Sequence, residues 1–96
     1  MMVLITYDVN TETQGGKNRL RKIAKQCLNF GQRVQNSVFE CLISPRDFTA
    51  LKNQIEKIMD KKQDSIRYYF LGNNWKSKVD HSGKNETYDP EGPLII

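Results

Sequence analysis

Residues 2–9 read MVLITYDV, and this stretch decides the fold of the 96-residue chain. In an extended chain, Val3 and Ile5 lie on one face and Leu4 lies on the other, so that both faces are apolar. A strand of this kind is typical of the interior of a sheet that is covered on each side. The sequence therefore predicts a first strand in the middle of a β-sheet.

Asp8 lies at the polar end of this run. A carboxylate at the end of an apolar strand needs hydrogen-bond donors, a cation or water to remain charged. One interpretation is a metal ligand. The other is that Asp8 opens a turn with Asn10 and Thr11 and caps the next helix, because such side chains bond to nearby backbone N–H groups. The residues alone leave both interpretations open.

The length of the chain predicts one domain, with a single layer of helices on one sheet. Its N-terminal apolar run is far shorter than the roughly 20 residues of a membrane span. The run also lacks the basic segment and the small-residue cleavage site of a signal peptide. We therefore expect a soluble, cytoplasmic protein.

The two cysteines, Cys27 and Cys41, belong to different predicted elements and form no CxxC or Cys/His cluster. We expect them to be small buried apolar side chains rather than a disulfide or a metal site.

Two helices are predicted from apolar residues that recur at helical spacing over residues 20–28 and 48–59. Gly31 is placed to end the first helix. Ser44 is expected to cap the start of the second helix, with the acid Asp47 at the position of a capping box.

Three further strands are predicted from alternating apolar residues. They cover residues 33–43, residues 65–71 and, as a short edge strand, residues 75–79. This order of elements fits the α+β class and a ferredoxin-like βαββαβ sandwich, with two helices on one face of an antiparallel sheet. We assign residues 1–80 to this domain and residues 81–96 to a C-terminal extension.

The net charge of +4 is unevenly distributed, because residues 80–96 hold Lys84 but also Asp80, Glu86, Asp89 and Glu91. The body of the chain is therefore basic, which favours a polyanionic partner such as nucleic acid. A charged helix surface can also serve solubility alone. The candidate phosphate contacts are Lys17, Arg19, Arg21, Lys22, Lys25, Arg33 and Arg67.

A homodimer is expected because two helices can cover only one face of a sheet whose strands are apolar on both. Sheet-to-sheet pairing would bring two copies of Asp8 together. Mg²⁺ prefers an octahedral shell of oxygens, so two carboxylates and several waters could hold it, and Mn²⁺ could substitute. Such a site would favour phosphodiester chemistry.

Three segments together resemble the CRISPR-associated protein 2 family over residues 2–80: VLITYDV at 3–9, GQRVQNSVFE at 31–40 and DSIRYYFLG at 64–72. The resemblance implies a ferredoxin-like homodimer with metal-dependent nuclease activity on RNA or on double-stranded DNA. It also implies a partnership with the CRISPR-associated protein 1 integrase in acquiring new spacers.

By this resemblance, Asp8 matches the acid assigned to Mg²⁺ binding and catalysis. Tyr7, Ser37 and Phe39 match family motif positions. The last apolar residues, 93–96, correspond to a terminal strand that crosses to the partner subunit.

Two functions remain as hypotheses. In the first, a homodimeric Mg²⁺-dependent endonuclease uses the paired Asp8 side chains to hold the ion. In the second, the dimer is a non-catalytic scaffold whose basic faces carry duplex DNA for the integrase. One chain lacks the additional acids that a nuclease centre normally needs, so the enzyme hypothesis depends on the dimer.

Overall fold

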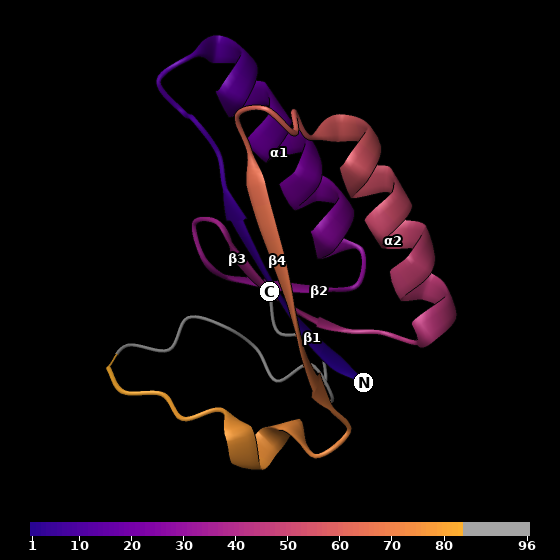
Figure 1. Cartoon of the computed structure of the whole chain (residues 1–96). Helices are drawn as coiled ribbons and strands as arrows, with labels where there is room; N and C mark the ends of the chain where they lie inside the picture. Colours follow the sequence, from indigo (N-terminus) through magenta and orange to yellow (C-terminus); the bar gives the residue numbers. More distant parts are fainter. Residues whose placement is uncertain (84–96) are drawn as a thin grey trace.

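The computed structural model describes residues 1–83, which form one four-stranded sheet and two α-helices (Figure 1). The strand order β2-β3-β1-β4 and the antiparallel pairing confirm the predicted ferredoxin-like α+β fold. The predicted terminal strand lies outside the described residues. The elements are β1 (Met2–Asp8), α1 (Gln14–Leu28), β2 (Gly31–Gln35), β3 (Val38–Leu42), α2 (Pro45–Ile58), β4 (Ser65–Gly72) and the short 3₁₀ helix η1 (Trp75–Lys78).

The first strand lies inside the sheet, as predicted, with β3 on one side and β4 on the other. Its register places Ile5 opposite Phe39 of β3 and opposite Tyr68 of β4. Val3 and Ile5 are fully buried, whereas Leu4 is half-buried. The two faces of β1 therefore differ: one belongs to the core and the other is partly open.

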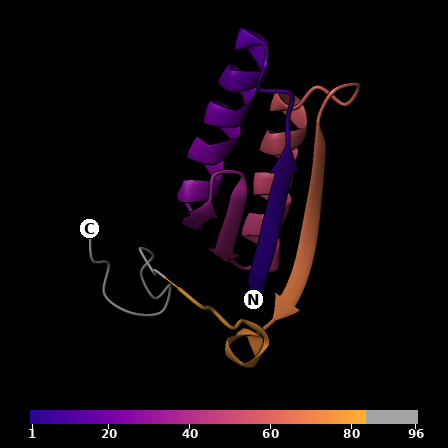
Figure 2. The same ribbon diagram turned by 90° about the vertical axis from the view of Figure 1, so that its left-hand side faces the viewer.

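Both helices lie on the same side of the sheet (Figure 2). From α1, Ile23 and Cys27 enter the core, and α2 contributes Leu51 and Ile55. Neither helix covers the face that carries Leu4, which confirms the prediction that two helices cover one face.

Side-chain caps start both helices. The N–H of Asp47 donates to Ser44 Oγ at 3.1 Å, which confirms the predicted cap of α2. In α1, the N–H of Gly16 donates to Thr13 Oγ1 at 3.0 Å. The helix therefore begins at Gln14, six residues before the apolar spacing that predicted it.

The predicted strand over residues 33–43 is wrong, because the structure contains a hairpin there. β2 and β3 pair antiparallel and are joined at Asn36 and Ser37. A two-residue connection interrupts the alternation so briefly that the run resembled one strand.

Gly31 does not end α1, because the helix closes at Leu28 with Asn29 as its C-cap and Gly31 is the first residue of β2. A Cβ atom at Gly31 would lie 1.9 Å from the carbonyl oxygen of Glu40. The glycine is therefore explained by the close approach of β3.

The predicted edge strand over residues 75–79 is also wrong, since residues Trp75–Lys78 form η1. Gly72 has φ +75 and directs the chain away from the sheet. Trp75 is buried, and Lys78 Nζ donates to the carbonyl of Leu71 at 2.9 Å. Five alternating residues are too few to distinguish a strand from a helical turn.

Cys27 and Cys41 are buried free thiols, as predicted. Among residues 1–83, no helix is long and apolar enough to cross a membrane.

Candidate functional site

Asp8 is the last residue of β1 and lies opposite Ser65, the first residue of β4. The Asp8 side chain is exposed, on the face that the helices leave open. A hollow of about 410 Å³ surrounds it. This Asp8 hollow is lined by Thr6, Tyr7, Asp8, Ser37, Ser65 and Arg67.

The turn-and-cap interpretation holds for Asn10, which opens the turn, but not for Asp8, and the helix cap is Thr13. Asn10 Oδ1 accepts the N–H of Glu12 at 3.0 Å, and Thr13 caps α1. No donor within residues 1–83 forms a hydrogen bond with the Asp8 carboxylate. Its oxygens are therefore available to a ligand.

The donor set of the Asp8 hollow fits Mg²⁺ better than Zn²⁺. Within the described part of the chain, no three His, Cys, Asp or Glu side chains gather as a metal cluster. Zn²⁺ sites use three or four such ligands, whereas Mg²⁺ is commonly held by one or two carboxylates and keeps several waters. The carboxylate of Asp8 matches the second pattern, and Ser37 and Ser65 line the same hollow.

Arg67 supplies positive charge to the Asp8 hollow. It lies opposite Thr6 in the β1–β4 register, and its Nη1 donates to the hydroxyl of Tyr69 at 3.3 Å. A guanidinium beside a carboxylate suits a phosphate that bridges a cation and an arginine. Arg67 is therefore well placed for the phosphate contact predicted from the sequence.

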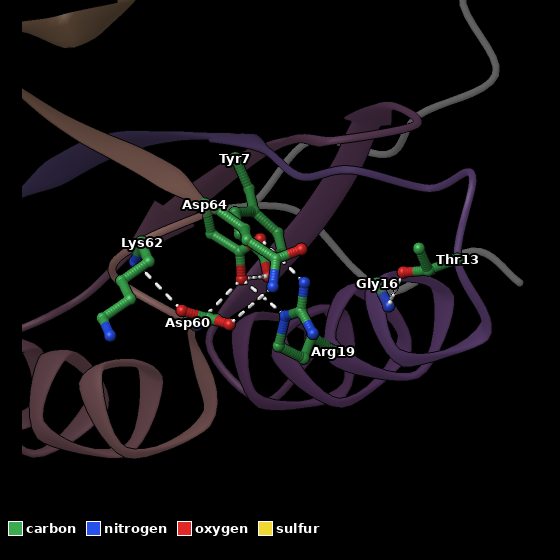
Figure 3. A network of polar contacts seen from close by, with 8 residues as sticks. Tyr7, Thr13, Gly16, Arg19, Asp60, Lys62 and Asp64 are labelled. Carbon is green, nitrogen blue, oxygen red and sulfur yellow. Dashed lines mark hydrogen bonds and ion pairs between the residues drawn. The ribbon is translucent and has the colours of Figure 1, made fainter.

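Tyr7, the residue before Asp8, belongs to a buried network around the carboxylate of Asp64 (Figure 3). The Tyr7 hydroxyl donates to Asp64 Oδ2 at 2.8 Å. Arg19 Nε and Nη2 donate to its two oxygens at 2.8 and 3.2 Å, and the N–H of Asp60 adds a bond of 2.9 Å. The Asp64 side chain is 0% exposed and the Arg19 side chain 17% exposed, so water screens this pair only weakly.

Burial alone would raise the pKa of Asp64, but hydrogen bonds from Arg19, the Asp60 backbone and Tyr7 outweigh it and lower the pKa below its usual value. Burial, together with the bond to Asp64, raises the pKa of Tyr7. A carboxyl whose pKa is lowered by folding stabilises the fold above its unfolded pKa. The contribution of Asp64 is lost as the pH falls through the lowered value.

Arg19 therefore does not lie with the other cations of α1. Its guanidinium is bound to Asp64, and this bidentate pair explains its position without a phosphate. Arg19 is therefore engaged by Asp64 and is not a candidate nucleic-acid contact.

Three of the four remaining cations of α1 line a groove of about 720 Å³. Lys17, Arg21 and Lys25 recur every four residues and so share one side of the helix, and Arg33 joins them from β2. Apolar residues, among them Ala24, also line this basic groove, and it shares no lining residue with the Asp8 hollow. Lys22 is exposed but does not line the groove.

The residues that match the family motif, Tyr7, Ser37 and Phe39, stabilise the sheet. The Tyr7 N–H donates to the Ser37 carbonyl at 2.8 Å, which ties β1 to the hairpin turn. Phe39 is fully buried, and the Arg33 guanidinium lies 5.2 Å from its ring centroid.

Sequence reasoning missed Asp64 and Ser65 as parts of the site. Asp64 and Arg19 are separated by 45 residues, so no local spacing connects them. One signal was available: Asp64 directly precedes an apolar strand. A carboxylate that is buried at such a position needs a partner of opposite charge or hydrogen-bond donors.

Comparison with known proteins places the chain in a family. The profile of the family described as CRISPR associated protein Cas2 matches residues 1–79. The "CRISPR-associated endoribonuclease Cas2" of Nitratidesulfovibrio vulgaris is 54% identical over 96 residues, which cover all of this chain and 94% of that protein. The "CRISPR-associated endonuclease Cas2" of Halalkalibacterium halodurans is 55% identical, and the match covers both chains completely.

A solved structure agrees with these sequences. The crystal structure of Cas2 from Streptococcus pyogenes is 57% identical and superimposes with a TM-score of 0.80, covering 86% of this chain and 100% of that one. The chain therefore belongs to the CRISPR associated protein Cas2 family.

Proposed function

We propose that this chain is a Mg²⁺-dependent endonuclease of the CRISPR spacer-acquisition system that cleaves phosphodiester bonds as a homodimer. The observation that carries the proposal is the position of Asp8, an exposed carboxylate at the end of a central strand inside a hollow that also holds Arg67. The names of two relatives support nuclease chemistry. One specifies RNA and the other does not, so both RNA and double-stranded DNA are candidate substrates.

The homodimer supplies the second carboxylate. On the open face of the sheet, Leu4, Val38 and Leu42 are only half-buried and Tyr69 is 43% exposed. Burial of such side chains against a second copy is favourable, because about 25 cal/mol is gained for each Å² of apolar surface removed from water. This packing would bring the two Asp8 side chains toward a shared two-fold axis.

Three residues of the Asp8 hollow have distinct tasks in this mechanism. Asp8 would hold the cation through its carboxylate oxygens. Arg67 neutralises a phosphate oxygen and orients the backbone of the substrate, while Ser65 can donate a hydrogen bond to another phosphate oxygen. Bound Mg²⁺ would supply charge that polarises the phosphate and makes a water molecule a stronger nucleophile.

The proposal predicts cleavage that depends on the cation. Single-stranded RNA and duplex DNA should each be incubated with the purified full chain and Mg²⁺, and products measured on denaturing gels. We expect cleavage of at least one substrate, loss of cleavage with excess chelator, and recovery on addition of Mn²⁺. Cleavage that persists in excess chelator would contradict metal dependence, and sedimentation as a monomer under assay conditions would contradict a shared site.

A second function, a duplex-binding scaffold for the CRISPR-associated protein 1 integrase, is favoured by one observation. The basic groove shares no residue with the Asp8 hollow, so it can hold phosphates without presenting them to the candidate catalytic centre. Phosphate contacts of this kind provide affinity but carry no base sequence information.

Because Arg21 and Lys25 line the basic groove, we expect the double variant Arg21→Ala/Lys25→Ala to bind duplex DNA more weakly than the wild type. Removal of two phosphate contacts should lower the slope of log affinity against log salt by about 2, because each contact releases roughly one counterion. Fluorescence anisotropy over a salt series measures the slope.

The matched control is Arg46→Ala/Lys57→Ala, which removes the same two charges from exposed positions on α2. Equal losses in both variants would show that net charge, not the basic groove, determines binding. If the Arg21/Lys25 variant loses duplex binding but still cleaves RNA, scaffold and enzyme are separate functions of two surfaces.

A further inference from the structure

We propose that Asp64 is a positioning residue that fixes the Asp8 carboxylate by joining the ends of β1 and β4 to α1. This inference rests on the proposed function, because it gives Asp64 an effect on a metal ligand. Asp64 itself does not reach the Asp8 hollow, since it is absent from the lining and its side chain is fully buried. Its influence therefore passes through the backbone.

The strand register places the network next to Asp8. Asp8 opposite Ser65 is the last pair of the β1–β4 ladder. Tyr7 precedes Asp8 and Asp64 precedes Ser65, so the bond of 2.8 Å between Tyr7 and Asp64 closes the strand pair where the backbone ladder stops. Without this bond, that end of the pair would be free to fray.

The network also fixes the segment that leaves Asp8. Arg19 holds Asp64 with two hydrogen bonds and thereby ties α1 to the strand ends (Figure 3). At the start of α1, Thr13 caps the helix through the N–H of Gly16. The loop between Asp8 and α1 is thus anchored at both ends.

A fixed carboxylate is a better metal ligand than a mobile one, because less conformational entropy is lost when the ion binds. Loss of a group that orients a ligand typically reduces metal affinity or activity by about 10–100-fold. Since Asp64 acts on Asp8 through the backbone, we expect that loss of its carboxylate lowers the metal affinity by about 10-fold.

The test is the variant Asp64→Asn in the full-length chain, which keeps the size of the side chain and removes its charge. Mn²⁺ affinity is measured without catalysis, from the paramagnetic broadening of the amide resonances around Asp8. We expect about 10-fold weaker Mn²⁺ binding and about 10-fold lower kcat, with unchanged KM for the nucleic acid. Amide hydrogen exchange at Asp8 and Ser65 should become faster.

The control for general destabilisation is Leu51→Ala, which truncates a buried side chain of α2 away from the network. All variants are assayed at a temperature at which circular dichroism shows them folded. The double variant Asp64→Asn/Arg19→Gln should bind Mn²⁺ about as tightly as whichever of the two single variants binds it less tightly. The two losses should not add, because the two residues belong to one network.

The outcomes separate this inference from the proposed function. If the wild-type chain cleaves but Asp64→Asn equals Leu51→Ala in Mn²⁺ affinity and kcat, the positioning role is overturned and the nuclease remains. If the wild type binds Mn²⁺ without cleaving, the proposed function fails, and the Mn²⁺ affinity of Asp64→Asn alone supports or overturns the positioning role. A wild-type chain that binds no Mn²⁺ near Asp8 overturns both.

Discussion

Replacement of Asp8 by Asn should reduce Mg²⁺-dependent cleavage by roughly 10³-fold, since a metal-bound transition state gains several kcal/mol from the ion and each 1.4 kcal/mol is a factor of ten. Asparagine preserves the shape of the side chain but is a poor ligand for a hard cation. Single-turnover cleavage at saturating Mg²⁺ measures the loss.

The fold and the dimer should survive this substitution. Asp8 is exposed, and surface substitutions usually change the free energy of unfolding by less than about 0.5 kcal/mol. In chelator, the variant dimer should be at least as stable as the wild-type dimer, because two facing carboxylates repel each other. Cleavage at the wild-type rate, or a variant that no longer dimerises, would refute the role given to Asp8.

A mixing experiment tests whether the carboxylates are shared. Heterodimers of wild-type and Asp8→Asn chains would hold one carboxylate instead of two. If the ion is bound between the chains, the heterodimers should be nearly inactive, and activity should fall with the square of the wild-type fraction. A linear decrease would indicate two independent centres.

Substitution of Gly16 by Ala should destabilise the fold by about 2–4 kcal/mol, a large effect for one methyl group. A Cβ atom at Gly16 would lie 1.6 Å from the carbonyl oxygen of Asn10 and 2.7 Å from its carbonyl carbon. Both atoms belong to the backbone, so no side-chain rotation relieves the clash. The loop that follows Asp8 must move away from α1, and thermal unfolding should show the loss.

The adjacent glycine provides the control. At Gly15 the nearest atom to an added Cβ would be Nη1 of the Arg19 side chain, at 3.4 Å. Alanine has the higher helix propensity, so Gly15→Ala should be neutral or stabilise the fold by about 0.5 kcal/mol. If Gly16→Ala unfolds at the same temperature as Gly15→Ala, the close approach of the loop to the helix is wrong.

Much of the fold could be predicted from local patterns. The doubly apolar first strand identified the centre of the sheet, and Ser44 identified the start of α2. The β2–β3 hairpin could not be predicted from alternation, because its connection is only two residues long. The turn at Trp75–Lys78 could not either, since burial of Trp75 is a tertiary effect that overrides a five-residue pattern.

The site was predictable only in part. Asp8 was identifiable because a carboxylate at the end of an apolar strand needs hydrogen-bond donors, a cation or water to remain charged. The direction of Arg19 could have been inferred from helix geometry, because two residues turn the helix by about 200° and so separate Arg19 from the stripe of Lys17 and Arg21. Its partner could not be inferred, because Asp64 becomes a neighbour only after the whole sheet has formed.

The order of strands in the sheet has a consequence for biosynthesis. β1 leaves the ribosome first, but it lies inside the sheet and needs β4 as its neighbour on one side. Tyr7 and its hydrogen-bond partner Asp64 are separated by 57 positions in the sequence. Contacts so distant along the chain form late. A nascent chain therefore cannot assemble the Asp8 hollow until β4, which contributes Ser65 and Arg67, has been translated.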